Sequence, residues 1–129
     1  AWARDLDRPT AMAISPMIST SFPIAERIGA RWVDRIHGQW VVHYARIALS
    51  RDHLSEAERA RFQRYFDAEL ARTRAVIREK KPELIFTDGA GRYDWLTEAM
   101  LADDPGLLDD YEVFAQEGRV RILRRRQGA

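Results

Sequence analysis

Residues 55–91 read SEAERARFQRYFDAELARTRAVIREKKPELIFTDGAG, and they predict a long helix followed by a short strand. Ser55 and Glu58 have the spacing of a capping box, in which each side chain pairs with a backbone N–H left open at the start of a helix. Pro82 ends the helix because it has no N–H to donate. An apolar run follows at residues 84–88. These residues therefore indicate one helix-to-strand unit of an α/β sheet.

The spacing of apolar residues predicts which face of this helix is buried. Apolar side chains recur at steps of three and four residues, the period of a helix face. They are Phe62, Tyr65, Phe66, Leu70, Val76 and Ile77, and we expect them to face the sheet. The arginines that we expect to stay in solvent are Arg61, Arg64, Arg72 and Arg78.

The rest of the chain adds strands and helices around this unit. We expect strands at residues 10–15, 30–35, 110–115 and 119–123, and helices at residues 22–28, 39–49 and 93–101. Right-handed crossovers place the first three strands in parallel. The predicted fold class is α/β: a Rossmann-like three-layer sandwich with a mostly parallel sheet of order about 2-1-3 and a C-terminal antiparallel hairpin.

Length and composition indicate a single globular α/β domain over residues 1–129. The 129 residues are 46% hydrophobic and 32% charged, with a formal net charge of +1. That balance does not indicate a nucleic-acid surface. The chain has no Cys, so disulfides and thiolate sites are excluded. No apolar run approaches the ~20 residues of a membrane span, and we expect that the chain is cut from a larger protein.

Two loops are expected to meet at the carboxyl edge of the sheet, where ligands of α/β proteins bind at the reversal of strand order. The candidate ligand-binding residues in these loops are Ser15, Ser19, Thr20, Ser21, Asp88, Gly89 and Gly91. Glycines let backbone N–H groups approach an anion closely. However, neither a Walker Lys nor a complete Gly-x-Gly-x-x-Gly is present. We prefer the interpretation that the loops use glycine for turn geometry and hydroxyls for capping.

Three residues form one stripe on the helix expected at residues 39–49: Trp40, Tyr44 and Ile47. We prefer the interpretation that this stripe covers the core. A sharper alternative makes Trp40 and Tyr44 an aromatic pair that rests on lipid or on a partner helix, because amphipathic rings suit such a boundary. The helix has no basic polar face, which weakens the lipid alternative.

The sequence shows no recognisable catalytic or metal-binding constellation. The three histidines, His37, His43 and His53, lack metal-ligand spacing, and we expect surface or capping roles for them. The carboxylate pairs at residues 103–104 and 109–110 lie in an expected solvent-exposed loop, and no nucleophile motif occurs. We predict no catalytic residue, no metal and no cofactor. The basic end at residues 124–126 is expected to protect an edge strand first and to contact anionic lipid or nucleic acid second.

Short motifs spread over most of the chain resemble one family. They are Ala13-Ile14-Ser15-Pro16, Ser21-Phe22-Pro23, Gly29-Ala30-Arg31-Trp32 and Gln39-Trp40, followed by residues 81–88, Trp95, Tyr111 and residues 119–124. Together they are similar to the soluble C-terminal region of bacterial polytopic membrane glycosyltransferases akin to dolichyl-phosphate-mannose mannosyltransferases.

The resemblance implies a domain that follows a bundle of membrane helices, on the periplasmic side of the bacterial inner membrane. Such a parent transfers sugars from a lipid-phosphate donor, and its catalytic acidic residue lies in a loop that this sequence does not contain. We therefore expect an accessory domain that is not catalytic by itself. Its expected partners are the membrane helices of the parent and anionic lipid headgroups. The alternative is a stand-alone α/β module that binds a small anion, such as a nucleotide or a sugar phosphate.

Overall fold

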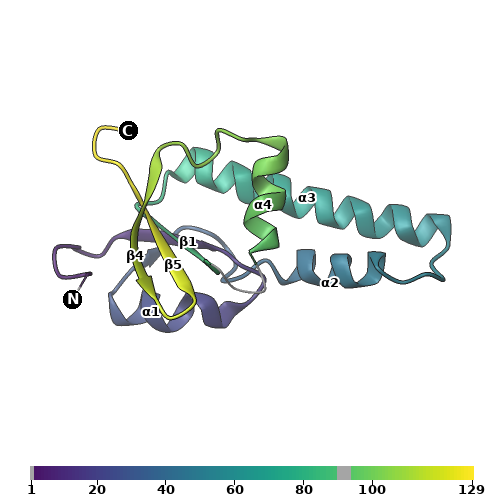
Figure 1. Ribbon diagram of the computed structural model, residues 1–129, viewed down its shortest axis with the longest axis horizontal. Helices are drawn as coiled ribbons and strands as arrows, with labels where there is room; N and C mark the ends of the chain where they lie inside the picture. Colours follow the sequence, from purple (N-terminus) through teal and green to yellow (C-terminus); the bar gives the residue numbers. More distant parts are fainter. Residues whose placement is uncertain (1, 90–93) are drawn as a thin grey trace.

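The computed structural model of the protein describes residues 2–89 and 94–129. Figure 1 shows the sheet at one end of the molecule and a long helical hairpin that extends away from it. The elements in chain order are β1 (Thr10–Ile14), the 3-10 helix η1 (Ile18–Thr20), α1 (Phe22–Arg27), β2 (Arg31–Trp32), α2 (Trp40–Leu49), α3 (Glu56–Lys80), β3 (Leu84–Thr87), α4 (Trp95–Asp103), β4 (Tyr111–Glu117) and β5 (Val120–Arg125).

The described strands form one five-stranded mixed sheet of order β2-β1-β3-β5-β4. β1 runs parallel to both β2 and β3, whereas β5 runs antiparallel to β3 and to β4. The α/β class and the C-terminal antiparallel hairpin are therefore confirmed. The first three strands follow the order 2-1-3, and the full order differs from it because β5 pairs with β3 and β4 follows β5, so the hairpin extends the sheet beyond β3.

Helices cover both faces of the sheet, because side chains alternate between the two faces along each strand. On one face, Met12 and Ile14 of β1 pack in a cluster with side chains of α2, α3 and α4. On the other face, Ala13 and Phe86 pack with Ile24 of α1. Met12, Ala13, Ile14 and Phe86 are each at most 1% exposed. Burial on both faces explains why these strands read as continuous apolar runs.

Helix α3 begins and ends as the sequence predicts. Ser55 Oγ accepts a hydrogen bond from Glu58 N at 3.1 Å, and Ser55 N donates to Glu58 Oε1 at 3.3 Å. These hydrogen bonds lower the pKa of the Glu58 carboxyl. At the other end, Lys81 takes the left-handed conformation with φ 46° directly before Pro82. The capping box and the proline therefore set the two limits of the helix.

The buried side of α3 differs from the prediction at Tyr65 and Arg72. Leu70 is buried as expected, but Tyr65 is 49% exposed. The first half of α3 extends past the sheet and lies against α2 (Figure 1), so its outer side meets solvent. Arg72 was expected in solvent, yet its Nη1 donates to the buried Asp34 Oδ1 at 2.6 Å. Hydrogen bonds to Glu69 and Asp34 raise the pKa of the Arg72 guanidinium.

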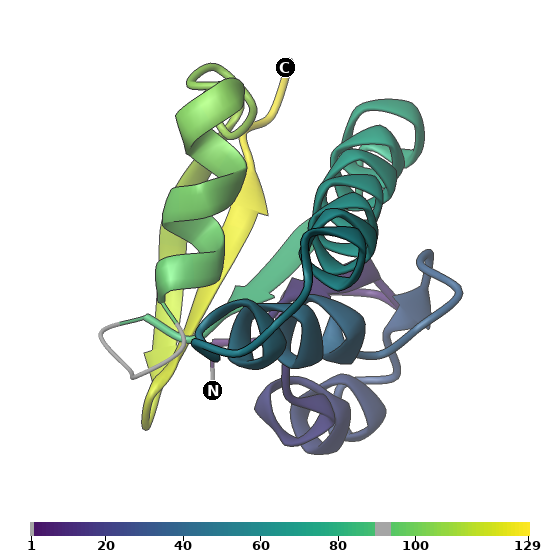
Figure 2. The same cartoon turned by 90° about the vertical axis from the view of Figure 1, so that its right-hand side faces the viewer.

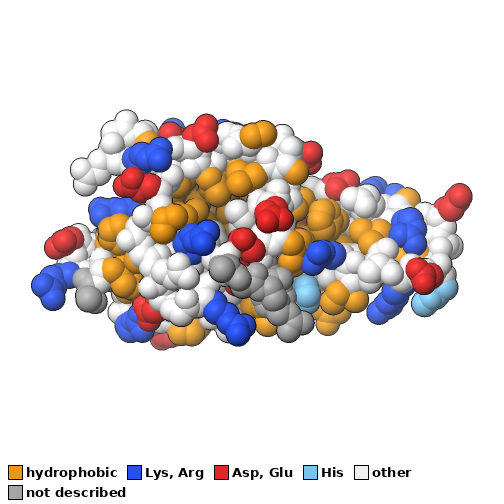
Figure 3. All heavy atoms as spheres, in the orientation of Figure 1, with side chains coloured by type: hydrophobic (Ala, Val, Ile, Leu, Met, Phe, Trp, Pro, Cys, Tyr) orange, Lys and Arg blue, Asp and Glu red, His pale blue; other side chains and the backbone are white. Residues whose placement is uncertain are grey.

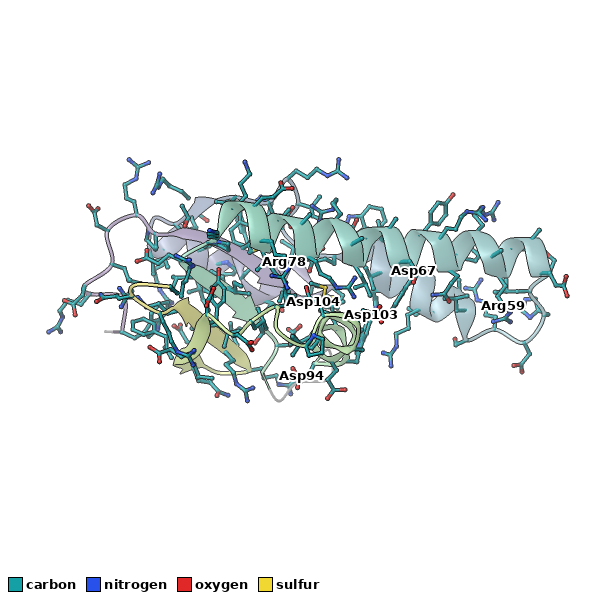
Figure 4. The ribbon with its side chains drawn as sticks, turned by 90° about the horizontal axis from the view of Figure 1, so that it is seen from above. Arg59, Asp67, Arg78, Asp94, Asp103 and Asp104 are labelled. Atoms are coloured by element: carbon teal, nitrogen blue, oxygen red, sulfur yellow. The ribbon has the colours of Figure 1, made fainter. Side chains whose placement is uncertain are left out.

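Arginines of α3 hold α4 in place. Arg78 Nη2 lies 2.5 Å from Asp104 Oδ1, and Figure 4 shows the two side chains pointing toward one another. Arg74 Nε donates to Met100 O at 3.2 Å, near the carbonyl end of α4 where positive charge is favourable. The face of the sheet that carries α2 and α3 thus also carries α4, and side chains of α3 bind the C-terminal end of this helix.

Helix α2 is turned the opposite way from the preferred interpretation of its sequence. Its buried residues are Val42, Ala45 and Ala48. They lie toward α3, and Figure 2 shows α2 alongside α3 with α1 on its other side. The stripe of Trp40, Tyr44 and Ile47 is 52%, 68% and 44% exposed, so the prediction that it covers the core is wrong. The alanine side faces α3 because its short side chains let the two helices approach closely.

Candidate functional site

A chain of hydrogen bonds joins the two loops that the sequence singles out. Met17 N donates to Ser15 Oγ at 3.1 Å, and Ser15 Oγ donates to Thr20 Oγ1 at 2.9 Å. Thr20 Oγ1 then donates to Asp88 Oδ1 at 2.7 Å. Ser15 directly follows β1 and Asp88 directly follows β3, so this polar chain crosses the edge where the strand order reverses. The structure therefore brings Ser15, Thr20 and Asp88 together.

The polar chain is buried from solvent, and its hydroxyl groups donate their hydrogen bonds to each other and to Asp88. Ser15 is fully buried, and Thr20 and Asp88 are each 7% exposed. The hydroxyl hydrogens of Ser15 and Thr20 are both donated within the polar chain. The polar chain ends at the Asp88 carboxylate, which repels an anion. Asp88 Oδ2 has no hydrogen-bond partner among the described residues. This geometry favours a structural role over phosphate binding, although anion binding at the two loops stays a prediction.

Gln39 completes the polar chain and was missed by the sequence analysis. Its Oε1 accepts from Ser15 N at 2.8 Å, and its Nε2 donates to Ala13 O at 2.9 Å. Its own backbone N donates to Ser15 O at 2.7 Å. A side-chain amide carries the same donor and acceptor as a peptide group. Gln39 therefore pairs with the end of β1 as a neighbouring strand does. No sequence pattern predicts that role.

The remaining predicted site residues have different environments. Ser19 is exposed, whereas Ser21 is buried and its Oγ has no partner among the described residues. Gly89 has φ +58°, and a Cβ at this position would lie 2.8 Å from Arg119 O. The close approach of β5 therefore explains this glycine by geometry. Gly91 lies outside the described residues.

No catalytic or metal-binding group was predicted, and the described residues contain no cluster of His, Asp or Glu that could hold a metal ion. His37 departs from its expected surface or capping role. Its ring lies 5.3 Å from that of Phe22 and 4.9 Å from that of Trp32, measured between centroids. The histidine thus packs as one of three neighbouring rings that connect α1 to the segment before α2.

The basic end of the chain is balanced by nearby carboxylates. Arg124 Nη2 lies 3.6 Å from Glu83 Oε1, and Arg126 Nε lies 3.6 Å from Glu112 Oε2. The Arg124 guanidinium also lies 5.0 Å from the centroid of the Phe114 ring. These contacts fit the first interpretation, a charged strand end. Lipid contact at this end stays a prediction.

A group of exposed apolar side chains lies beside the polar chain. We call it the apolar patch, and it consists of Met17, Ile18, Phe22, Trp40, Tyr44 and Ile47. Their exposed fractions run from 37% at Met17 to 68% at Tyr44. A groove of about 520 Å³ runs through the patch, lined by Pro16, Met17, Ile18, Ser19, Phe22, Pro23, Trp40, His43 and Tyr44. Figure 3 shows hydrophobic side chains along α2.

Close packing of the backbone holds the two halves of the patch together. A Cβ on Gly38 would lie 3.0 Å from the carbonyl carbon of Met17, so the absence of a side chain lets the start of α2 approach η1. On α2 itself, the rings of Trp40 and Tyr44 make an edge-to-face pair with centroids 6.0 Å apart. The patch is therefore a surface with defined geometry.

Positive charge predominates in the sequence segments that carry the patch. Residues 9–25 and 35–51 contain no Asp or Glu, while residues 35–51 contain Arg35, Arg46 and Arg51 together with two histidines. None of these three arginines makes an ion pair within the described part of the chain. The Arg46 guanidinium instead lies 4.1 Å from the centroid of the Trp95 ring. The two segments that carry the patch are therefore, taken together, positive on balance, although the exposed Glu26 lies one helical turn after Phe22 and the exposed Asp52 follows Arg51.

Comparisons with protein-family models, with curated proteins and with solved structures find no match to the chain. The described residues also contain no helix with the length and apolar composition needed to cross a membrane.

Proposed function

We propose that the chain is an accessory domain without catalytic activity of its own, which docks through the apolar patch at the membrane part of a glycosyltransferase-like protein. The proposed location is the periplasmic side of the bacterial inner membrane, and the proposed fold family is Rossmann-like. The observation that carries the docking role is the exposure of six large apolar side chains in one place. The glycosyltransferase context comes from the sequence resemblance alone.

The size of the patch supports docking on energetic grounds. Fully burying a large apolar side chain contributes about 1.5–3 kcal/mol, and each patch residue is still partly exposed in the isolated domain. Monomeric soluble domains rarely leave such contiguous apolar surface uncovered unless it binds something. The core does not need these side chains, because separate buried clusters pack both faces of the sheet.

Accessibility of the patch in the intact membrane protein tests this proposal. The chain has no Cys, so a single cysteine can be introduced as Tyr44→Cys in the patch or as Tyr65→Cys on α3. We expect a water-soluble maleimide to label position 44 much more slowly than position 65 in native membranes. In denaturant the two rates should be equal. Equal labelling in membranes, or a reading frame before Ala1 without apolar spans of ~20 residues, contradicts the proposal.

The alternative proposal, a stand-alone module that binds a small anion, has a separate test. A ligand that binds the native state raises its thermal stability. A thermal-shift screen with nucleotides, sugar nucleotides and sugar phosphates therefore tests the two loops that carry Ser15 and Asp88. A stabilising ligand whose effect disappears in Ser21→Ala supports binding there, because the Ser21 hydroxyl has no partner among the described residues. No shift with any of these compounds argues against it.

A further inference from the structure

We infer that the partner of the apolar patch is the surface of an anionic lipid bilayer, into whose headgroup layer Trp40 and Tyr44 insert. The inference rests on the proposed docking role and names what covers the patch. It differs from the expected contact of headgroups with the Arg-rich end, because it places the lipid at the opposite edge of the sheet.

The side chains of the patch suit a lipid-water boundary. Trp and Tyr have an apolar ring and a polar group, and they are enriched where hydrocarbon meets headgroups. Trp40 and Tyr44 are 52% and 68% exposed and stand edge to face on the outer side of α2. Ile47 continues their stripe one turn later, and Ile18 and Phe22 extend it from the other half of the patch. Rings and aliphatic chains thus share one surface.

The charges around the patch select an anionic surface. Arg35, Arg46 and Arg51 lie in the sequence segment that carries α2 and make no ion pair within the described residues, and the Arg46 guanidinium lies against the Trp95 ring. In contrast, Arg72 and Arg78 of α3 are paired with Asp34 and Asp104. Basic residues beside a membrane are attracted by the negative potential of its lipids. Helix α2 itself has no basic face, and Arg35 and Arg51 lie before and after this helix in the sequence.

A second copy of the chain fits the patch less well than a bilayer does. A symmetric dimer places the same patch on both sides of the interface. Residues 35–51 carry three arginines and no acidic residue, so two copies that meet through this segment bring like charges together. Like charges facing each other across an interface are unfavourable. The bilayer is the occupant that satisfies both the apolar and the charged part of the surface.

Co-sedimentation with vesicles tests the inference. The purified 129-residue chain is mixed with vesicles of phosphatidylcholine alone, or of phosphatidylcholine with phosphatidylglycerol. We expect at least about tenfold tighter binding to the anionic vesicles, equivalent to roughly 1.4 kcal/mol, and weaker binding at high salt. Equal binding to both vesicles, or no binding to the anionic ones, overturns the inference.

Two matched double variants locate the contact. Trp40→Ser with Tyr44→Ser should reduce binding to anionic vesicles by about tenfold or more. Tyr65→Ser with Val113→Ser removes two side chains that are 49% and 61% exposed but lie outside the groove, and it should leave binding unchanged. Urea unfolding of both variants checks that each is folded. Equal losses in the two variants contradict insertion through the patch.

Tryptophan fluorescence gives an independent readout. The emission of the wild-type chain should shift to shorter wavelength when anionic vesicles are added, and the shift should disappear in Trp40→Phe, which keeps an apolar ring. A shift that persists in this variant contradicts insertion of Trp40. If vesicles fail to bind while position 44 is protected from maleimide in native membranes, the inference is wrong and the proposed docking role stands. If maleimide labels positions 44 and 65 equally in native membranes, the proposed docking role is also wrong.

Discussion

Strand β1 and the loop that follows it bury opposite kinds of side chain. In β1, residues 11–14 are apolar and at most 1% exposed. In the loop, Ser15 and Thr20 are buried, while Met17 and Ile18 are 37% and 53% exposed. The change occurs within one residue of the end of the strand, where the chain leaves the cover of helices on both faces.

The difference shows which interactions fix each region. Apolar burial on two faces holds β1, as in other parallel sheets. In the loop, the hydroxyls of Ser15 and Thr20 point inward. Ser15 donates a hydrogen bond to Thr20, and Thr20 donates one to Asp88. Because the hydroxyls point inward, the apolar side chains between them point outward. The loop therefore presents an apolar surface that its own fold does not use.

The sharpest test of this comparison uses two isoleucines on either side of the boundary. Ile14 is fully buried, whereas Ile18 is 53% exposed. Ile14→Ala should lower the free energy of unfolding by about 2–5 kcal/mol, because it leaves a cavity in the core. Ile18→Ala should change it by no more than about 0.5 kcal/mol. Urea unfolding of the two variants measures the difference, and similar losses would show that Ile18 supports the fold.

Two neighbouring hydroxyls provide the next test. Thr20→Val keeps the shape of the side chain but leaves Asp88 Oδ1 and Ser15 Oγ without their partner. Loss of a buried hydrogen-bond partner should cost about 1–3 kcal/mol of unfolding free energy. Ser19→Ala is the control, because Ser19 is exposed. If chemical denaturation shows that Thr20→Val and Ser19→Ala have the same free energy of unfolding, the polar chain does not stabilise the loop.

The smallest expected loss of unfolding free energy concerns Tyr111, at the opposite edge of the sheet. Tyr111 is buried and its hydroxyl donates to Pro82 O at 2.6 Å. Tyr111→Phe should cost about 1 kcal/mol near neutral pH, the usual net contribution of one hydrogen bond. This single contact is weaker than the polar chain because it satisfies one carbonyl rather than linking two loops.

The pH dependence of that effect follows from the Tyr111 pKa. Burial raises this pKa to about 12, compared with about 10 in an unfolded chain. The unfolded state therefore loses its proton first, so the stability from Tyr111 is complete below pH about 10 and declines as the pH rises toward 12. The stability gap between wild type and Tyr111→Phe should narrow over this range. A gap that stays constant in alkaline urea titrations contradicts the assignment.

Local signals in the sequence were sufficient for much of the fold. The capping box at Ser55 and the stop at Pro82 define α3, and the apolar runs define β1 and β3. The orientation of α2 was not predictable in the same way, because both of its sides carry apolar residues. Helical spacing shows that a stripe exists, but the position of α3 decides which stripe is covered.

The candidate site was predictable where topology alone determines it. Parallel strands bring their carboxyl ends to one edge, so Ser15 and Asp88 were expected to be close. Which hydroxyls of the loop turn inward was not predictable, because the 3-10 helix sets the directions of Ser19 and Thr20. Gln39 acts through its side-chain amide, which has no periodicity to reveal it. The apolar patch did have a sequence signal, the absence of Asp and Glu from residues 35–51.

Gln39 has a consequence for solubility. Strand β2 has only two residues, so most of the adjacent edge of β1 lacks a partner strand. Arg31 N donates to Pro9 O, and Val33 N donates to Ala11 O. Gln39 Nε2 continues this series by donating to Ala13 O. An open strand edge is a template on which another chain can add a strand and aggregate. The amide of one glutamine therefore occupies a position on the β1 edge at which another strand could otherwise add.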